Sequence, residues 1–171
     1  MKDKNIDIWP INFSAQTKES LPDHCWKYIL QLACILQMVP GWKGTTKLRV
    51  FTIGTQSSNE EAQRIIWNRR LKLLRIDAEV VFADWNEETY GIYDLDLKHC
   101  TTEIRERYFY HVNQFINNFS SQASMVFCYL FEPSSLPESY IEYLKNLTTM
   151  TDDFPPTLLV HGLTEVTSVT L

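Results

Sequence analysis

The sequence is poor in glycine, with five in 171 residues. It contains neither G-x-x-x-x-G-K-[ST] nor G-x-G-x-x-G, the motifs in which glycines let the backbone approach a phosphate group closely. Nucleotide sites of these two types are therefore excluded. No G-x-S-x-G elbow of a serine hydrolase is present either.

Basic charge is also in short supply, because 16 Lys and Arg residues face 21 Asp and Glu residues, a formal net charge of −5. Binding to a nucleic acid depends on a clustered excess of basic charge, so no nucleic acid is expected as a partner. No run approaches the 18 apolar residues of a membrane helix, and no apolar core of a signal peptide follows residues 1–5. We expect a soluble acidic domain.

The four cysteines show no C-x-x-C spacing, and Cys34 and Cys128 lie within apolar runs. Free cysteine behaves as a small buried hydrophobic residue, and reduced thiols are typical of the cytosol. We therefore predict reduced cysteines in a core rather than disulfides or a metal site. The four residues are Cys25, Cys34, Cys100 and Cys128.

Apolar residues are abundant at 44%, enough for a core, and the length suits one domain over residues 1–171. Short apolar segments alternate with amphipathic ones, as in parallel sheets whose strands are joined by helices. The predicted strands are residues 6–9, 47–53, 78–83, 125–131 and 157–161. The predicted helices run from Pro22 to Pro40, from Ser57 or Ser58 to about Arg75, from Thr101 or Thr102 to Phe119, and from Pro137 to Leu147.

This alternation predicts an α/β fold, a doubly wound and mainly parallel five-stranded sheet with helices on both faces. Strand orders 2-1-3-4-5 and 3-2-1-4-5 fit equally. Apolar residues spaced three and four apart predict the buried side of the first three helices. In chain order they are Trp26, Ile29, Leu30, Ala33 and Leu36; Ala62, Ile65, Ile66 and Leu73; and Ile104, Tyr108, Val112, Phe115 and Phe119. The fourth helix runs through Tyr140, Ile141, Tyr143, Leu144 and Leu147.

Residues 84–100 form the one long segment without a clear pattern, and loops of this length are either functional or mobile. Its carboxylates lack the order of a calcium-binding loop, which favours a solvated acidic surface. They are Asp84, Glu87, Glu88, Asp94 and Asp96, interspersed with Trp85, Tyr90 and Tyr93.

Two further segments have charge or backbone groups suited to ligands. Residues 54–59 lead into a helix N-terminus, which can hold an anion. Five basic residues on the following helix predict a solvated face, with an acidic partner or an anionic membrane as the alternative. They are Arg64, Arg69, Arg70, Lys72 and Arg75.

The four histidines, His24, His99, His111 and His161, lack the neighbours of a metal site or a catalytic set. We interpret them as packed or solvated side chains. The sequence therefore predicts no catalytic, cofactor-binding or metal-binding residue, no cofactor and no enzymatic activity.

Three segments resemble the cytosolic C-terminal domain of the cation-chloride cotransporters, solute carrier family 12. They are IDIW at residues 6–9, LRVFTIG at 48–54 and PPTLLVHG at 155–162, which bracket nearly the whole chain in the same order. His161 and Leu163 stand where most members have Arg and then Asn or Gly. His-Gly followed by residues 165–167 resembles the divergent ninth-member branch of the family.

The resemblance implies a regulatory and dimerising cytosolic domain, related in fold to universal stress proteins. It would be the second half of a transporter's C-terminal region, on the cytosolic face of a membrane. Transport of potassium or sodium with chloride would reside in membrane helices that this chain lacks. The implied partners are the transmembrane domain of the same transporter and a second copy or a related cotransporter. The chain would be a fragment, or a truncated product unable to transport.

Two alternatives stay open. One is a stand-alone nucleotide-binding protein of the universal-stress type that uses residues 54–59. The other is a C-terminal tail, residues 169–171, that a PDZ domain binds by strand addition.

Overall fold

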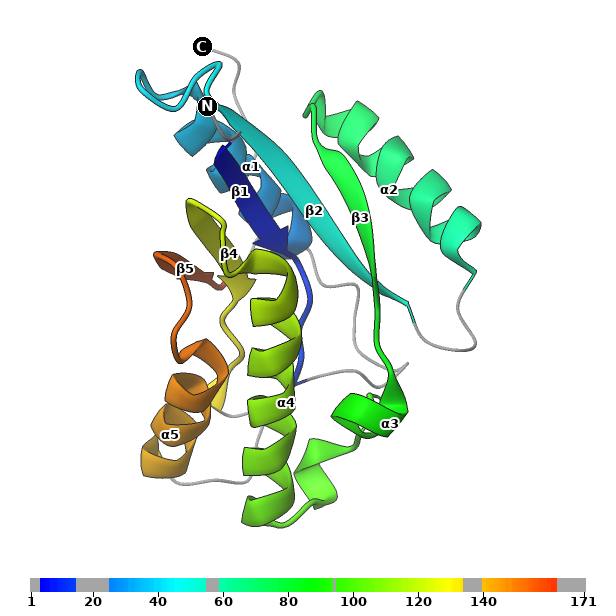
Figure 1. Ribbon diagram of the computed structural model, residues 1–171, viewed down its shortest axis with the longest axis vertical. Helices are drawn as coiled ribbons and strands as arrows, with labels where there is room; N and C mark the ends of the chain where they lie inside the picture. The colour runs from blue at the N-terminus through cyan, green and yellow to red at the C-terminus, as the bar shows by residue number, and fades with distance from the viewer. Residues whose placement is uncertain (1–3, 15–24, 55–58, 94, 134–139, 163–171) are drawn as a thin grey trace.

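In the computed structural model, one sheet of five parallel strands has the order β3-β2-β1-β4-β5 (Figure 1). The structure describes residues 4–14, 25–54, 59–93, 95–133 and 140–162. The sheet confirms the predicted doubly wound fold and decides between the two strand orders in favour of 3-2-1-4-5. The strands are β1 (Lys4–Trp9), β2 (Thr46–Gly54), β3 (Glu79–Asp84), β4 (Met125–Tyr129) and β5 (Thr157–Val160).

Helices lie on both sides of this sheet, with α1 and α4 on opposite faces in Figure 1. Trp26 of α1 meets Trp67 of α2 with ring centroids 5.9 Å apart, so these two helices share a face. Helices α4 and α5 pack against each other on the other face. The helices are α1 (Cys25–Met38), α2 (Glu60–Leu74), α3 (Glu87–Tyr90), α4 (Thr102–Ser120) and α5 (Tyr140–Thr151), with a 3₁₀ turn η1 (Leu97–His99).

The helix ends follow local chemistry. The Asn59 side chain accepts a hydrogen bond from the Ala62 amide and caps α2, so the predicted cap at Ser57 or Ser58 is wrong. Thr101 caps α4, as the sequence predicted. The start predicted for α1 at Pro22 and that for α5 at Pro137 lie outside the described residues.

The buried side predicted for α2 is wrong. Ile65 is 61% exposed and Leu73 is 74% exposed, while Trp67 and Leu71 face the core. Helix α2 has two apolar stripes, and the stripe with the large indole packs against the sheet because it buries more surface.

Helix α5 contains the residues predicted for it, and several of its apolar side chains are exposed too. Tyr140 and Ile141 are 79% and 80% exposed and Leu144 is also exposed, whereas Tyr143 is buried. In α4 the predicted stripe is correct except for Ile104, which lies exposed beyond the edge of the sheet. The stripe predicted for α1 faces the core.

An ion pair lies at the centre of the sheet. Asp7 of β1 is fully buried and stands opposite Arg49 of β2 in the strand register. Arg49 donates to both carboxylate oxygens, from Nε at 2.8 Å and from Nη2 at 2.6 Å. It also donates to the Phe119 carbonyl at 3.2 Å, which ties β2 to the end of α4.

Truncation of Asp7 and truncation of Arg49 will lower the free energy of unfolding by different amounts. Arg49→Ala leaves a fully buried carboxylate without a partner, and we expect a loss of about 3–5 kcal/mol of unfolding free energy. Asp7→Ala will cost less, because the Arg49 side chain is 22% exposed and can turn its charge to water. Urea titration measures both values, with exposed Lys43→Ala as a neutral control. Equal losses for Asp7→Ala and Arg49→Ala would contradict this account.

Candidate functional site

Doubly wound sheets bind ligands beyond the carboxyl ends of their strands, where the strand order reverses. In this chain that point lies between β1 and β4, and aromatic rings occupy it. Trp9, the last residue of β1, stacks on Phe51 at 4.2 Å and donates from its indole to Ser120 Oγ at 3.0 Å. After β4, Phe131 stacks on Phe109 of α4. The described part of this crevice pairs no nucleophile with a base.

Gly54, the first residue of the predicted anion-binding segment, has a packing role. A Cβ atom on this residue would come within 1.9 Å of the Phe82 ring, so only glycine fits beside that ring. Its carbonyl accepts a hydrogen bond from the Trp85 amide at 2.8 Å. Residues 55–58, on which the anion-binding hypothesis also depends, lie outside the described residues.

Residues 84–100 are more ordered in structure than the sequence predicted. Asn86 caps α3 and Asp96 caps η1, so two short helical turns replace the expected irregular stretch. Trp85 is buried and donates to the Gly91 carbonyl at 2.8 Å. Among the described residues, no three His, Cys, Asp or Glu side chains could hold a metal ion together. Asp94 lies outside the described part.

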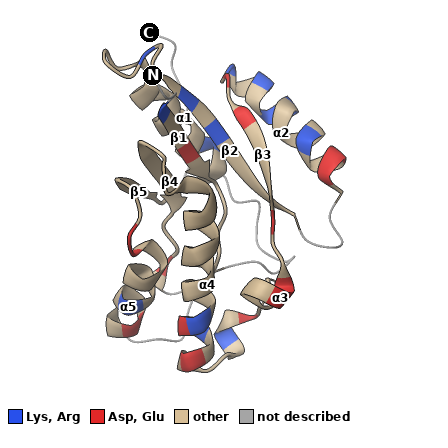
Figure 2. Ribbon diagram, viewed as in Figure 1, with Lys and Arg blue, Asp and Glu red and all other residues tan. Residues whose placement is uncertain are grey.

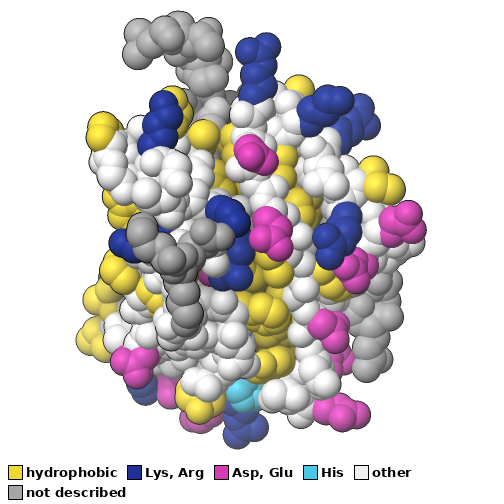
Figure 3. Space-filling view, turned by 45° about the horizontal axis from the view of Figure 1, so that its top comes forward, with side chains coloured by type: hydrophobic (Ala, Val, Ile, Leu, Met, Phe, Trp, Pro, Cys, Tyr) yellow, Lys and Arg dark blue, Asp and Glu magenta, His cyan; other side chains and the backbone are white. Residues whose placement is uncertain are grey.

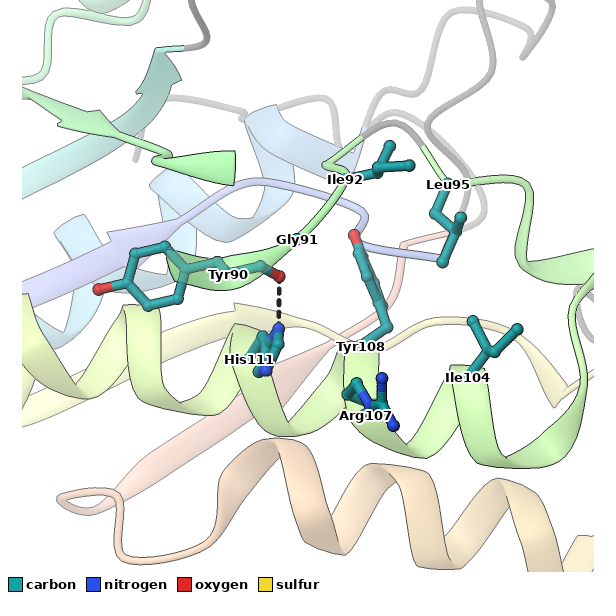
Figure 4. Close-up of a pocket in the computed structure, with 8 residues that line it drawn as sticks. All are labelled: Tyr90, Gly91, Ile92, Leu95, Ile104, Arg107, Tyr108 and His111. Carbon is teal, nitrogen blue, oxygen red and sulfur yellow. Dashed lines mark hydrogen bonds between the residues drawn. The ribbon is translucent and has the colours of Figure 1, made fainter. Parts of the chain in front are cut away.

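A pocket of about 290 Å³ lies between this segment and α4 (Figure 4). One wall comes from the segment, and the other from one side of α4. A hydrogen bond between the His111 ring and the Tyr90 carbonyl closes one end. The lining is almost wholly apolar, suited to an apolar group rather than to acid–base chemistry. The lining residues are Tyr90, Gly91, Ile92, Leu95, Ile104, Arg107, Tyr108 and His111.

The described histidines have local partners. His99 contacts Asp96 at 2.7 Å, and this hydrogen bond lowers the pKa of the Asp96 carboxyl. His161 contacts the Leu130 carbonyl at 3.0 Å through Nδ1 and Glu132 at 3.2 Å through Nε2. With His111 bonded to the Tyr90 carbonyl, these contacts agree with the structural interpretation of the histidines. His24 lies outside the described residues.

The five basic residues of α2 fall into two groups. Arg70 lies over the Trp26 ring at 4.7 Å and the Trp67 ring at 4.8 Å, and burial lowers the pKa of its guanidinium. Arg64 pairs with Glu60 at 2.8 Å. The other three, Arg69, Lys72 and Arg75, are exposed and form no ion pair with any residue that the structure describes.

Two helices have exposed surfaces that are largely apolar. The first set, which we call the α2 surface, is Ala62, Ile65, Ile66, Arg69 and Leu73. The second, the α5 surface, is Tyr140, Ile141, Leu144 and Thr148. The α2 surface contains an arginine at its centre, while the α5 surface has no charged residue. Figure 3 shows apolar side chains reaching the surface elsewhere too, in a strip down the middle of the face in view.

The helices of the described residues are too short or too polar to cross a membrane. No protein-family model matches the chain. The five-stranded parallel sheet with helices on both faces nevertheless defines the class of the chain, a doubly wound α/β domain.

Curated relatives that match nearly the whole chain are named solute carrier family 12 member 9. The relative from Danio rerio is 32% identical over 169 residues, which cover 97% of this chain and 18% of the relative. The relative from Homo sapiens is 29% identical over 194 residues, which cover 98% of this chain and 21% of the relative. A shorter match is to vacuolar cation-chloride cotransporter 1 of Saccharomyces cerevisiae. It is 32% identical over 103 residues, which cover 56% of this chain and 9% of that protein.

These relatives confirm the resemblance to solute carrier family 12 and to its ninth-member branch. The chain spans about a fifth of the length of the relatives named solute carrier family 12 member 9, although nearly the whole chain is matched.

The four cysteines are free thiols, as predicted, and they differ in reactivity. Burial, and to a smaller extent the nearby Asp7 carboxylate, raise the pKa of the Cys128 thiol to about 12. The thiolate is the reactive form of a cysteine, and near pH 8 a thiol with this pKa is ionised in only about 10⁻⁴ of the molecules. Cys100 is half-buried, and its thiol donates to the Asp96 carbonyl at 3.1 Å near the surface.

We expect iodoacetamide near pH 8 to alkylate Cys100 in the folded chain while Cys128 stays unmodified. Mass spectrometry of tryptic peptides measures both rates, and the same reaction in urea, where both thiols are accessible, is the control. Equal rates in the folded chain would contradict the burial of Cys128.

Proposed function

We propose that the chain is a non-enzymatic regulatory and dimerising domain of an electroneutral cation-chloride cotransporter, on the cytosolic face of the membrane. Transport would reside in membrane helices elsewhere in a longer polypeptide, whose transmembrane domain is the first partner of this domain. The observation that supports this proposal is the match of 97% of the chain to about a fifth of proteins named as solute carrier family 12 member 9.

The α5 surface supports the dimerising part of this proposal. Interfaces are enriched in tyrosine and depleted of charge at their centre, and Tyr140, Ile141 and Leu144 have this composition. Free in water, three large apolar side chains on one helix face are costly, and a second copy would cover them. Burying them would contribute several kcal/mol to association, at roughly 25 cal/mol for each Å².

The helix beneath this surface is firmly held, which preorganises it for binding. Tyr143 donates to the Phe131 carbonyl at 3.0 Å, and Lys145 pairs with Glu106 of α4 at 2.6 Å. At the end of the helix, Asn113 of α4 donates to the Met150 carbonyl at 3.1 Å and to the Asp152 carbonyl at 2.7 Å. Little side-chain or backbone ordering would remain to oppose association.

Light scattering after size-exclusion chromatography tests the dimer. We expect a concentration-dependent dimer for the unaltered chain, and a monomer at the same concentrations for the double variant Ile141→Asp, Leu144→Asp, because both charges would be buried in the interface. About a tenfold weaker dimer corresponds to 1.4 kcal/mol, so even one substitution is measurable.

The matched control is Ile65→Asp, which places the same charge on an exposed isoleucine of α2 and should leave the dimer intact. A monomer at all concentrations for the unaltered chain, or a dimer insensitive to both α5 substitutions, would refute a dimer through the α5 surface.

A further inference from the structure

We propose that the α2 surface is a docking site for an anionic lipid bilayer, with α2 lying parallel to the membrane plane. The proposal rests on the proposed function in one respect only, since a transporter domain works close to a membrane. The aliphatic and basic side chains of α2 carry the argument, and the α5 surface plays no part in it.

The apolar residues of the α2 surface form one stripe on the side of the helix that faces away from the sheet, interrupted by Arg69 between Ile66 and Leu73. Ala62, Ile65, Ile66 and Leu73 repeat at the spacing of successive helical turns. On the opposite side, Trp67 and Leu71 are buried in the core. The outer stripe is therefore additional to what the fold needs, and no described residue covers it.

Basic charge is concentrated on the same helix. From Glu60 to Arg75 there are five basic and two acidic residues, in a chain whose net charge is −5. Figure 2 shows blue along α2 and red at the end where it begins. Glu60 and Glu61 lie in the first turn, and Asp77 and Glu79 come after the helix.

The three unpaired basic residues lie where lipid headgroups would meet them. Arg69 is within the stripe, Lys72 is beside it, and Arg75 follows the last turn. Arg64 and Arg70 already have partners within the chain. Each Lys or Arg near an anionic bilayer contributes about 1 kcal/mol, so Arg69, Lys72 and Arg75 together give measurable binding.

The mixture of side chains favours a bilayer over an acidic protein. Strong protein interfaces centre on Trp, Tyr or Arg anchors seated in pockets. The α2 surface has no aromatic residue, and its one arginine, Arg69, is exposed. An amphipathic helix at a membrane inserts aliphatic side chains just below the headgroups while Lys and Arg contact the phosphates. Ile65, Ile66 and Leu73 around Arg69 match that arrangement.

Helix α2 is also fixed to the domain, so its outer side keeps one orientation. Arg70 packs on the rings of Trp26 and Trp67, which joins α2 to α1. Arg64 donates to the Val80 carbonyl of β3 at 3.3 Å. Docking through the α2 surface would therefore orient the whole sheet relative to the membrane.

Co-sedimentation of the full chain with lipid vesicles tests the proposal. We expect binding to phosphatidylcholine vesicles that contain phosphatidylserine, and little binding to vesicles of phosphatidylcholine alone. Added salt should weaken binding, because it screens the charge on Arg69, Lys72 and Arg75. Two double variants, Arg69→Glu with Lys72→Glu and Ile65→Asp with Leu73→Asp, should each reduce the partition coefficient about tenfold or more.

The matched control is Ile35→Asp on α1, which replaces an isoleucine with the same 61% exposure as Ile65 and should leave vesicle binding unchanged. All the substituted side chains are exposed, and circular dichroism with thermal unfolding checks that each variant is folded. Binding that survives either α2 double variant, or no binding to phosphatidylserine vesicles, would overturn the proposal.

Light scattering separates this proposal from the dimer. If Ile65→Asp dissociates the dimer, the α2 surface is an interface between copies and the lipid proposal fails. If Ile141→Asp leaves the oligomeric state unchanged while vesicle binding follows the α2 variants, the α5 dimer fails and the lipid proposal stands.

Discussion

The carboxylate of Asp7 is the constraint on which the sheet depends. A charge fully buried in the central strand costs several kcal/mol unless it is paired, and Arg49 supplies two hydrogen bonds from the facing strand. The pair fixes the register of β1 against β2. A slip of one residue would put the Asp7 and Arg49 side chains on opposite faces of the sheet. Through the Phe119 carbonyl the same guanidinium also positions the end of α4. Sheet centre and covering helix thus share this polar contact as well as the hydrogen bond from the Trp9 indole to Ser120.

The sequence was sufficient to predict the strands, the helices and the fold class, because alternation of short apolar and amphipathic segments has few solutions. It could not decide the strand order, since both orders satisfy the same crossover rule. It also misassigned the outer side of α2. Ile65 and Trp67 belong to different apolar stripes of one helix, and periodicity alone does not say which stripe faces a sheet. The size of the indole and the basic residues around Ile65 were the available signals.

The candidate surfaces were hard to predict for a related reason. Sequence reasoning looked for polar chemistry at strand ends, where the structure has aromatic packing. The Phe82 ring leaves room only for a glycine at position 54. The hydrogen bond from the Trp85 indole to the Gly91 carbonyl helps to order the acidic segment. The sequence showed the basic cluster of α2, but it did not show which of these residues pack within the domain and which face outward. Only the position of the two indoles shows that Arg70 is held inside while Arg69 is free to act outside.

The strand order has a consequence for how weak contacts add up. With order 3-2-1-4-5, α2 lies beside β3 at one end of the sheet, and α5 lies on the other face toward β5 (Figure 1). A pair of chains joined through α5 would therefore leave both α2 helices outermost. The outer sides of the two helices would face away from each other, so both cannot lie on one flat bilayer and the pair gains no avidity there. Assembly through α5 and docking through α2 would therefore be independent of each other at a single membrane.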